Sequence, residues 1–128
     1  STPLYWHFNR AAGEPKVAMR IGDWKILASL DKPPSAKGNS ITEQGEKDFK
    51  TAEMTQFWLY NLRADIGEKN DLAGKESTRL EEMKAQLTAK YHEVRDESPA
   101  WPAWEFTGAE GKKIVWPDYV KKPKAAKK

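Results

Sequence analysis

The first part of the chain alternates apolar and polar positions in a way that predicts a strand followed by a β-hairpin. Residues 4–8 read LYWHF, and aromatic residues of this kind favour strands. Residues 16–31 read KVAMRIGDWKILASLD, two apolar segments separated by Gly22 and Asp23. Glycine adopts the positive φ that the first central position of a type II′ turn needs, so this pair predicts a two-residue hairpin turn.

The two-residue turn also predicts the register of the hairpin. One side of the ribbon then carries three apolar pairs: Ile21 with Trp24, Met19 with Ile26, and Val17 with Ala28. On the other side, Arg20 stands directly opposite Lys25. Like charges in this position destabilise a sheet by a few tenths to roughly 1 kcal/mol. We therefore expect a nearby carboxylate or an anionic partner, or else both side chains extended into water.

Three more elements are predicted after the hairpin. The segment SITE at residues 40–43 has the spacing of a helix capping box, which predicts a short helix over residues 41–53. Residues 56–62, QFWLYNL, predict a fourth strand, and because nearly every position is apolar we expect it to be central and covered on both faces. A long helix over residues 75–96 is predicted by apolar residues at intervals of three and four: Leu80, Met83, Leu87, Tyr91 and Val94.

Together these elements predict an α+β fold. We expect a four-stranded antiparallel sheet with one long C-terminal helix packed across it, and a short helix in the loop before the last strand. The apolar stripe of the long helix is the natural cover for the apolar side of the hairpin. We place this subdomain at residues 1–104. Residues 105–128 form an extension with a basic tail that is expected to be disordered.

Composition narrows the class of protein. The 128 residues are 38% apolar with a mean hydropathy of −0.85, which suits one polar domain with a small core. No apolar run approaches the roughly 20 residues of a membrane span, and residues 1–4 lack the features of a signal peptide, so we expect no membrane partner. The absence of cysteine excludes disulfides, thiolate metal sites and a cysteine nucleophile.

The sequence pI of 9.0 comes from the C-terminal end of the chain. Five lysines lie among the last eight residues, and without them the chain has 17 basic and 19 acidic residues. The part predicted to fold is therefore not basic, and we expect no nucleic-acid partner. Attraction of the tail to a polyanion is the alternative.

Few residues of the chain suit catalysis. Its two histidines, His7 and His92, are expected on different elements, and neither has a serine or carboxylate partner by spacing. The sequence has no zinc-type histidine cluster, no phosphate-binding glycine loop and no calcium-loop spacing, so we expect no complete enzyme. If strand alternation puts Trp6 and Phe8 into the core, His7 projects from the opposite face. There it has a structural, a solvated or a substrate-lining role.

Several segments, in order and with compatible spacing, resemble the C-terminal subdomain of the arylsulfatase-type sulfatases. They span residues 3–104 and include LYWHF (4–8), AMRIGDWKI (18–26), LYNLRADIGE with NDLA (59–73), and VRDESP (94–99). The chain is most similar to the bacterial enzymes described as like N-acetylgalactosamine-6-sulfatase, which act on sulfated carbohydrates. This resemblance implies the same sheet and helix, docked in a parent enzyme on a large α/β catalytic domain.

The resemblance also implies where the chemistry lies. In that family a formylglycine, made from the cysteine or serine of a C/S-x-P-x-R motif, attacks the sulfate ester beside a calcium ion held by carboxylates. This motif is absent here, so we expect a C-terminal fragment of a sulfatase that is inactive alone and holds no cofactor, while the parent uses calcium and a formylglycine. The expected partners are the N-terminal catalytic domain and a sulfated carbohydrate, in a periplasmic or secreted parent. The exposed docking face suggests some self-association of the isolated domain.

The loop after the first strand lies near the mouth of the substrate site in related enzymes. The resemblance therefore implies that His7, Asn9 and Arg10 are candidate contacts to a sugar or its sulfate. The rest of the chain is then structural and shapes the substrate cleft. An arginine suits bidentate binding of sulfate, as it does of phosphate.

Two other functions stay open. One is a nucleic-acid-associated module that acts through the basic tail. The other is a stand-alone carbohydrate-binding module that stacks sugars on exposed tryptophans: Trp101, Trp104 or Trp116.

Overall fold

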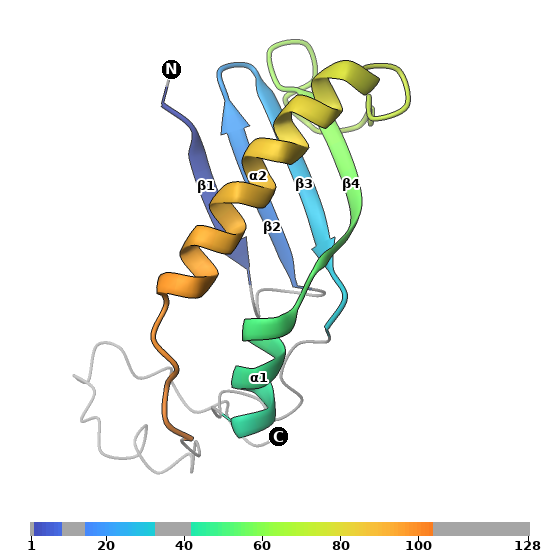
Figure 1. Ribbon diagram of the computed structural model, residues 1–128. Helices are drawn as coiled ribbons and strands as arrows, with labels where there is room; N and C mark the ends of the chain where they lie inside the picture. Colours follow the sequence, from blue (N-terminus) through green and yellow to red (C-terminus); the bar gives the residue numbers. More distant parts are fainter. Residues whose placement is uncertain (1, 9–14, 33–41, 104–128) are drawn as a thin grey trace, which may run out of the picture.

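The computed structural model describes residues 2–8, 15–32 and 42–103. They form one antiparallel sheet and two helices, in the chain order β1 (Leu4–Phe8), β2 (Lys16–Ile21), β3 (Trp24–Leu30), α1 (Glu43–Thr51), β4 (Met54–Asn61) and α2 (Ser77–Glu97). The strand order is β1-β2-β3-β4, and α2 lies diagonally across one face of the sheet (Figure 1). The predicted α+β fold is confirmed. The predicted extension over residues 105–128 lies outside the described residues.

The hairpin of β2 and β3 has the predicted turn and register. Gly22 has a φ of 60°, in the left-handed region that glycine enters without steric cost. The three predicted apolar pairs are all present: Ile21 with Trp24, Met19 with Ile26, and Val17 with Ala28. Arg20 stands opposite Lys25 on the other side, as predicted.

The strand β4 lies at an edge of the sheet, so the prediction of a central strand covered on both faces is wrong. Leu59 is fully buried, whereas Trp58 and Tyr60 are only partly buried. The strand is apolar at nearly every position because one face packs toward α2 while the other holds aromatic rings at the surface. Its outer edge is covered by the chain that follows: the Leu59 amide donates to the Asp71 carboxylate at 2.9 Å, and the Leu59 carbonyl accepts from the Leu72 amide at 2.7 Å.

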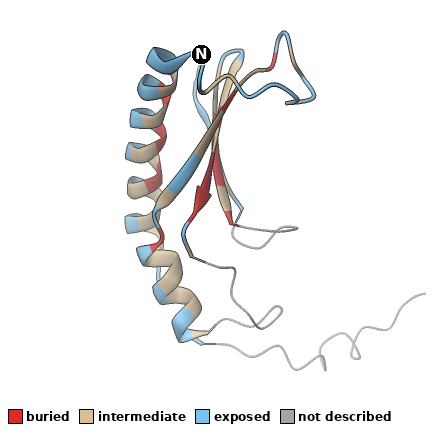
Figure 2. Ribbon diagram, turned by 90° about the vertical axis from the view of Figure 1, so that its right-hand side faces the viewer, coloured by how far each residue is buried: buried red, intermediate tan, exposed pale blue. Residues whose placement is uncertain are grey.

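The core lies between α2 and one face of the sheet (Figure 2). The predicted stripe of α2 is confirmed, because Met83, Leu87 and Tyr91 are its buried residues. Strands β2, β3 and β4 supply most of the rest: Val17, Met19, Ile26, Ala28, Leu30 and Leu59. The buried Tyr91 hydroxyl donates a hydrogen bond of 2.6 Å to the carbonyl of Ala52, which satisfies both polar groups.

The short helix α1 lies beside the C-terminal end of α2 (Figure 1). It begins two residues later than predicted, because its N-cap is Thr42 and not Ser40. The Thr42 hydroxyl accepts a hydrogen bond of 2.9 Å from the Gly45 amide, which is the same three-residue spacing shifted along the chain. At the other end of α1, the Lys50 ammonium donates to carbonyls at the end of α2, those of Arg95 and Ser98.

Candidate functional site

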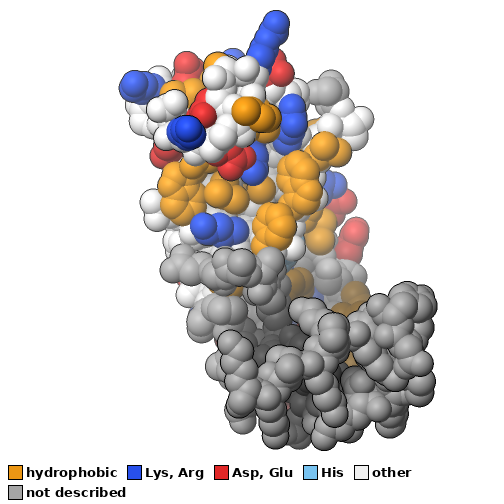
Figure 3. Space-filling model, turned by 180° about the vertical axis from the view of Figure 1, so that it is seen from behind, with side chains coloured by type: hydrophobic (Ala, Val, Ile, Leu, Met, Phe, Trp, Pro, Cys, Tyr) orange, Lys and Arg blue, Asp and Glu red, His pale blue; other side chains and the backbone are white. Residues whose placement is uncertain are grey.

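The face of the sheet turned away from α2 is named the open face. Strand alternation puts every second residue on it, and the register aligns these residues across the sheet: Leu4, Trp6, Phe8, Lys16, Ala18, Arg20, Lys25, Leu27, Ser29, Trp58 and Tyr60. Figure 3 looks onto this side of the molecule and shows hydrophobic side chains gathered between lysines and arginines. Packing against α2 does not explain why this face is apolar.

The centre of the open face is a cross-strand row, named the tryptophan row. Trp6 on β1 pairs with Ala18 on β2, which pairs with Leu27 on β3, which pairs with Trp58 on β4. Ala18 is buried, and Leu27 and Trp58 are partly buried. The two indoles therefore stand on either side of a small residue and a leucine, which makes an apolar strip across the full width of the sheet.

The outer strand β1 carries most of the exposed apolar surface. The exposed fractions of its three open-face residues are 53% for Leu4, 37% for Trp6 and 43% for Phe8. Scattered exposed apolar residues are normal on a protein surface, whereas a contiguous patch on one face marks a contact surface. These three residues alternate along one strand and therefore form such a patch.

A second cross-strand row of the open face, named the cation row, runs beside the tryptophan row. It consists of Leu4, Arg20, Lys25 and Tyr60. The Lys25 ammonium forms an ion pair with the Glu68 carboxylate, so the carboxylate predicted near the opposed cations is present for Lys25. Arg20 donates through Nε to the carbonyl of Gly22 in its own turn, at 2.9 Å. Within the described ranges, no carboxylate forms an ion pair with Arg20.

The loop after β4 holds Glu68 in place for this ion pair. Glu68 has a φ of 51°, the left-handed conformation that a side chain other than glycine adopts rarely and at a cost of roughly 1 kcal/mol. The carboxylate of Asp65 accepts from the amides of Lys69 at 3.1 Å and Asn70 at 2.8 Å. These hydrogen bonds, that from Asn70 first, lower the pKa of Asp65. Burial raises the pKa of Tyr60, and the nearby carboxylates of this loop raise it further.

His7 lies on the opposite face of β1, under the helices. The premise that Trp6 and Phe8 enter the core is wrong: they point to the open face, and His7 points toward the core. Its ring stacks on Phe49 at 5.2 Å between centroids with an interplanar angle of 9°, and it meets the edge of Tyr91 at 5.9 Å. Of the three predicted substrate contacts only His7 is described, since Asn9 and Arg10 lie outside the described residues.

Burial leaves two polar atoms of β1 without a hydrogen bond to any described residue. These are the Nε2 atom of His7 and the hydroxyl of Tyr5. Burial lowers the pKa of His7, since the charged imidazolium loses its hydration there. Burial, reinforced by Tyr91, raises the pKa of Tyr5 to about 12. Both side chains are therefore neutral at pH 7, and a role of His7 in binding a sulfated sugar stays a prediction.

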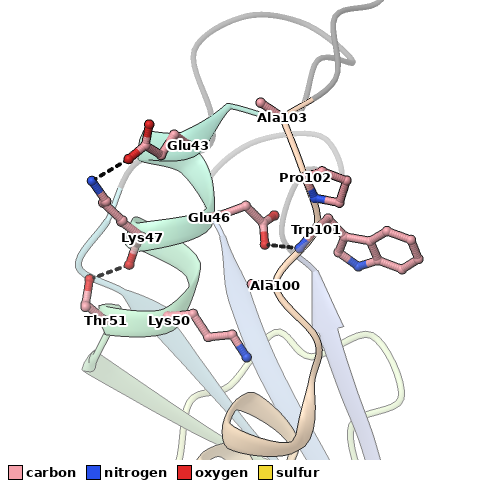
Figure 4. Close-up of a pocket in the computed structure, with 9 residues that line it drawn as sticks. All are labelled: Glu43, Glu46, Lys47, Lys50, Thr51, Ala100, Trp101, Pro102 and Ala103. Atoms are coloured by element: carbon pink, nitrogen blue, oxygen red, sulfur yellow. Dashed lines mark hydrogen bonds and ion pairs between the residues drawn. The ribbon is translucent and has the colours of Figure 1, made fainter.

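A pocket of about 510 Å³ lies between α1 and residues 100–103 (Figure 4). Its wall includes Glu46, whose carboxylate accepts from the Trp101 amide at 3.0 Å, and Lys50, whose ammonium is held by the end of α2. The side chain of Trp101 is 62% exposed, and Figure 4 shows its indole on the side of the segment away from α1. Trp101 is thus exposed as the carbohydrate-binding alternative requires. Trp104 and Trp116 lie outside the described residues.

No group of three or more histidine, cysteine, aspartate or glutamate side chains that could hold a metal ion is present in residues 2–8, 15–32 and 42–103. Over the same ranges, neither helix has the length and apolar character needed to cross a membrane.

No protein-family model matches the chain, and no curated protein matches it either. The open face is the feature that sequence reasoning missed. Alternation along residues 4–8 could not reveal it, because the side of this strand that meets the helix depends on its register with the hairpin. The observed register puts Trp6 beside Ala18 and away from the apolar side that meets the helix.

Proposed function

We propose that this chain is the C-terminal subdomain of an arylsulfatase-type sulfatase that hydrolyses sulfate esters of carbohydrates. In this proposal the chain is structural and shapes the substrate cleft, and a separate domain of the same protein carries the chemistry. The observation that carries the proposal is the one-sided sheet: α2 covers one face, while the other exposes Leu4, Trp6 and Phe8. A sheet with an apolar outer face needs a second layer.

The order of elements supports this assignment. The resemblance implies a four-stranded antiparallel sheet with a long helix packed across it, and the described residues have this arrangement. The segments that carry the resemblance fall on β1, on the β2–β3 turn, on β4 with its following loop, and on the end of α2. They do not include α1 or the first part of α2.

Polar side chains of the segment 59–73 form hydrogen bonds to the backbone that hold the shape of the loop. The Asn61 side chain accepts from the amides of Arg63 at 3.1 Å and Ala64 at 3.4 Å. Asp71 accepts from the amides of Leu59 and Ala73, at 2.9 and 3.0 Å. These carboxylate and amide groups are thus used in shaping a loop, which fits a chain whose role in the parent is structural.

The catalytic groups in this proposal belong to the parent. The parent supplies the formylglycine and the calcium ion, and its N-terminal domain is the partner of this chain. His7, with Asn9 and Arg10 in the segment that follows β1, is the candidate contact to the sugar or its sulfate. The contribution of this chain is then to substrate binding. We expect His7→Ala in the full-length parent to raise KM or to lower kcat/KM.

The test begins with the gene. The proposal expects an open reading frame upstream of this segment that encodes a C/S-x-P-x-R motif. The full-length product should release sulfate from an aryl sulfate and from a sulfated carbohydrate, and the isolated chain should not. Turnover by the isolated chain, or an inactive full-length product that carries the formylglycine and calcium, contradicts the proposal.

The 62% exposure of Trp101 favours one alternative, a carbohydrate-binding module. A glycan-binding assay on the isolated chain separates the two functions. A detached cleft wall binds sulfated sugars feebly, whereas a binding module holds them in a way that Trp101→Ala abolishes. Binding that survives this substitution argues against the module.

A further inference from the structure

We propose that the open face is the surface by which this chain docks on the larger domain of its parent, with Arg20 pairing with a carboxylate of that domain. This inference rests on the proposed function, since it takes the catalytic domain as the occupant. It adds which face is used and which residue provides the charged contact.

The tryptophan row gives the surface an apolar centre. Trp6 and Trp58 are large, and Ala18 and Leu27 lie between them on the two central strands. Aromatic residues are enriched at the centres of protein interfaces, because they bury much area with few rotatable bonds. The strands carry the core on their other side, so this surface is already rigid before it meets a partner.

Cations flank this apolar centre on both sides. Arg20 and Lys25 belong to the cation row, and Lys16 lies on the other side of the tryptophan row, with its ammonium 5.4 Å from the centroid of the Trp58 ring. No residue of the open face is acidic. An apolar centre with a charged border is the usual anatomy of a protein interface, and this border calls for acidic groups opposite.

The two opposed cations of the hairpin differ in their partners. Glu68 reaches from the loop after β4 and pairs with Lys25. Arg20 lies one strand further from that loop, and the single hydrogen bond described for its side chain uses Nε. A guanidinium has five N–H donors and binds a carboxylate through two of them at once. Among the cations of the open face, Lys25 pairs with Glu68 and the Lys16 ammonium lies over the Trp58 ring. Arg20 is therefore the cation whose remaining N–H donors suit a carboxylate from outside the described residues.

Charge also selects among occupants. A second copy of this chain, stacked face to face, supplies no carboxylate to Arg20, because no residue of the open face is acidic and Glu68 is already paired with Lys25. A sulfated glycan offers sugar rings to the indoles and anions to the cations, so it is tested below as the competing occupant. A protein surface that is apolar and carries a carboxylate would cover the tryptophan row and also pair with Arg20.

The first experiment is hydroxyl-radical footprinting of the isolated chain and of the full-length gene product. We expect Trp6 and Phe8 to be oxidised in the isolated chain and protected at least fivefold in the full-length protein, with about equal oxidation of Ile66. Ile66 is the matched control because it is 80% exposed and lies in the loop after β4. Equal oxidation of Trp6 in both proteins overturns the docking surface.

The second experiment addresses Arg20 in the full-length protein. Arg20→Glu should reduce the protection of Trp6, whereas Arg63→Glu makes the same charge change at an exposed arginine outside the open face and should leave it unchanged. Arg20→Lys retains the charge and introduces an amine. A carbodiimide should then join the R20K side chain to a carboxylate of the upstream domain, in a crosslinked peptide absent from the wild type. An R20E protein with full protection, or R20K without such a crosslink, overturns the role of Arg20.

The outcomes separate the inference from the proposed function. An active sulfatase with an oxidised Trp6 rejects the docking surface alone, and an inactive full-length protein with a protected Trp6 rejects the sulfatase alone. A gene product without an upstream domain rejects both. Protection of Trp6 that rises with the concentration of the isolated chain, or on addition of chondroitin sulfate, assigns the face to a second copy or to a sulfated glycan and overturns the inference.

Discussion

The Lys25 ammonium forms an ion pair with the carboxylate of Glu68, 43 residues further along the chain. Lys25 stands directly opposite Arg20 in the hairpin, so the Glu68 carboxylate reduces the repulsion between these two cations. It also ties the loop after β4 to the middle of the sheet. The contact thus links the stability of the fold to the charge of the open face.

Replacing Glu68 by Gln should lower the free energy of unfolding of the isolated chain by roughly 1 kcal/mol, because Lys25 loses its partner and faces Arg20 alone. Urea denaturation at low ionic strength measures the change. Added salt should narrow the difference from the wild type. Glu93→Gln is the control, since it removes an exposed pair with Lys90 one turn apart and should change stability by less than about 0.5 kcal/mol. Equal effects of the two substitutions would contradict the assignment.

His7 should make the stability of the chain depend on pH. Burial lowers its pKa below the ordinary value of 6.5, so the unfolded chain binds the proton more readily than the folded one. The stabilising effect is complete above pH 6.5 and is lost as pH falls toward the lowered pKa. The rings packed against His7, those of Phe49 and Tyr91, are uncharged over this range.

The substitution His7→Phe isolates this effect. It keeps an aromatic ring against Phe49 and removes the titrating group. Denaturation at pH 7.5 and at pH 5 should give a smaller difference for the variant than for the wild type. A variant with the full wild-type difference would exclude His7 as the source.

Removing the hydroxyl of Tyr91 should destabilise the core. Tyr91→Phe deletes a buried hydrogen bond of 2.6 Å to the carbonyl of Ala52. The Arg95 guanidinium also donates to that carbonyl, at 3.3 Å, so we expect a loss of about 1 kcal/mol and not more than about 2. Tyr60→Phe is the matched control: no hydrogen bond of its hydroxyl to a described residue is present, and its stability should be close to that of the wild type. Thermal denaturation of both variants provides the measurement.

Asp71 should keep the outer edge of β4 from pairing with other chains, because its carboxylate binds the Leu59 amide there. Asp71→Ala removes the acceptor of the Leu59 amide at 2.9 Å and of the Ala73 amide at 3.0 Å. We expect a loss of about 2 kcal/mol and faster hydrogen exchange at Leu59, together with more aggregation, because an uncovered strand edge pairs with other chains. Asp71→Asn keeps one carbonyl oxygen and should retain most of the stability. Unchanged exchange at Leu59 in D71A would show that the edge has other cover.

Short-range patterns were sufficient for most of the fold. The Gly22–Asp23 turn determines the register of the hairpin, because a two-residue loop leaves one pairing of the strands. The spacing of Met83, Leu87 and Tyr91 predicts a helix and its buried side, because residues three and four apart share a face. The prediction places the N-cap of the short helix at Ser40, two residues before the observed cap at Thr42, because serine and threonine are both good N-cap residues.

The sequence by itself therefore determined the hairpin, the two helices and the α+β class, each of which depends on neighbours along the chain. The tertiary structure alone decided which side of β1 faces the core, that β4 is an edge strand, and that Glu68 reaches Lys25. Alternation divides Trp6 from His7 but does not say which side the helix covers, because both sides are apolar enough to be buried. That choice depends on long-range packing, and it places the tryptophans on the open face and His7 under the helices.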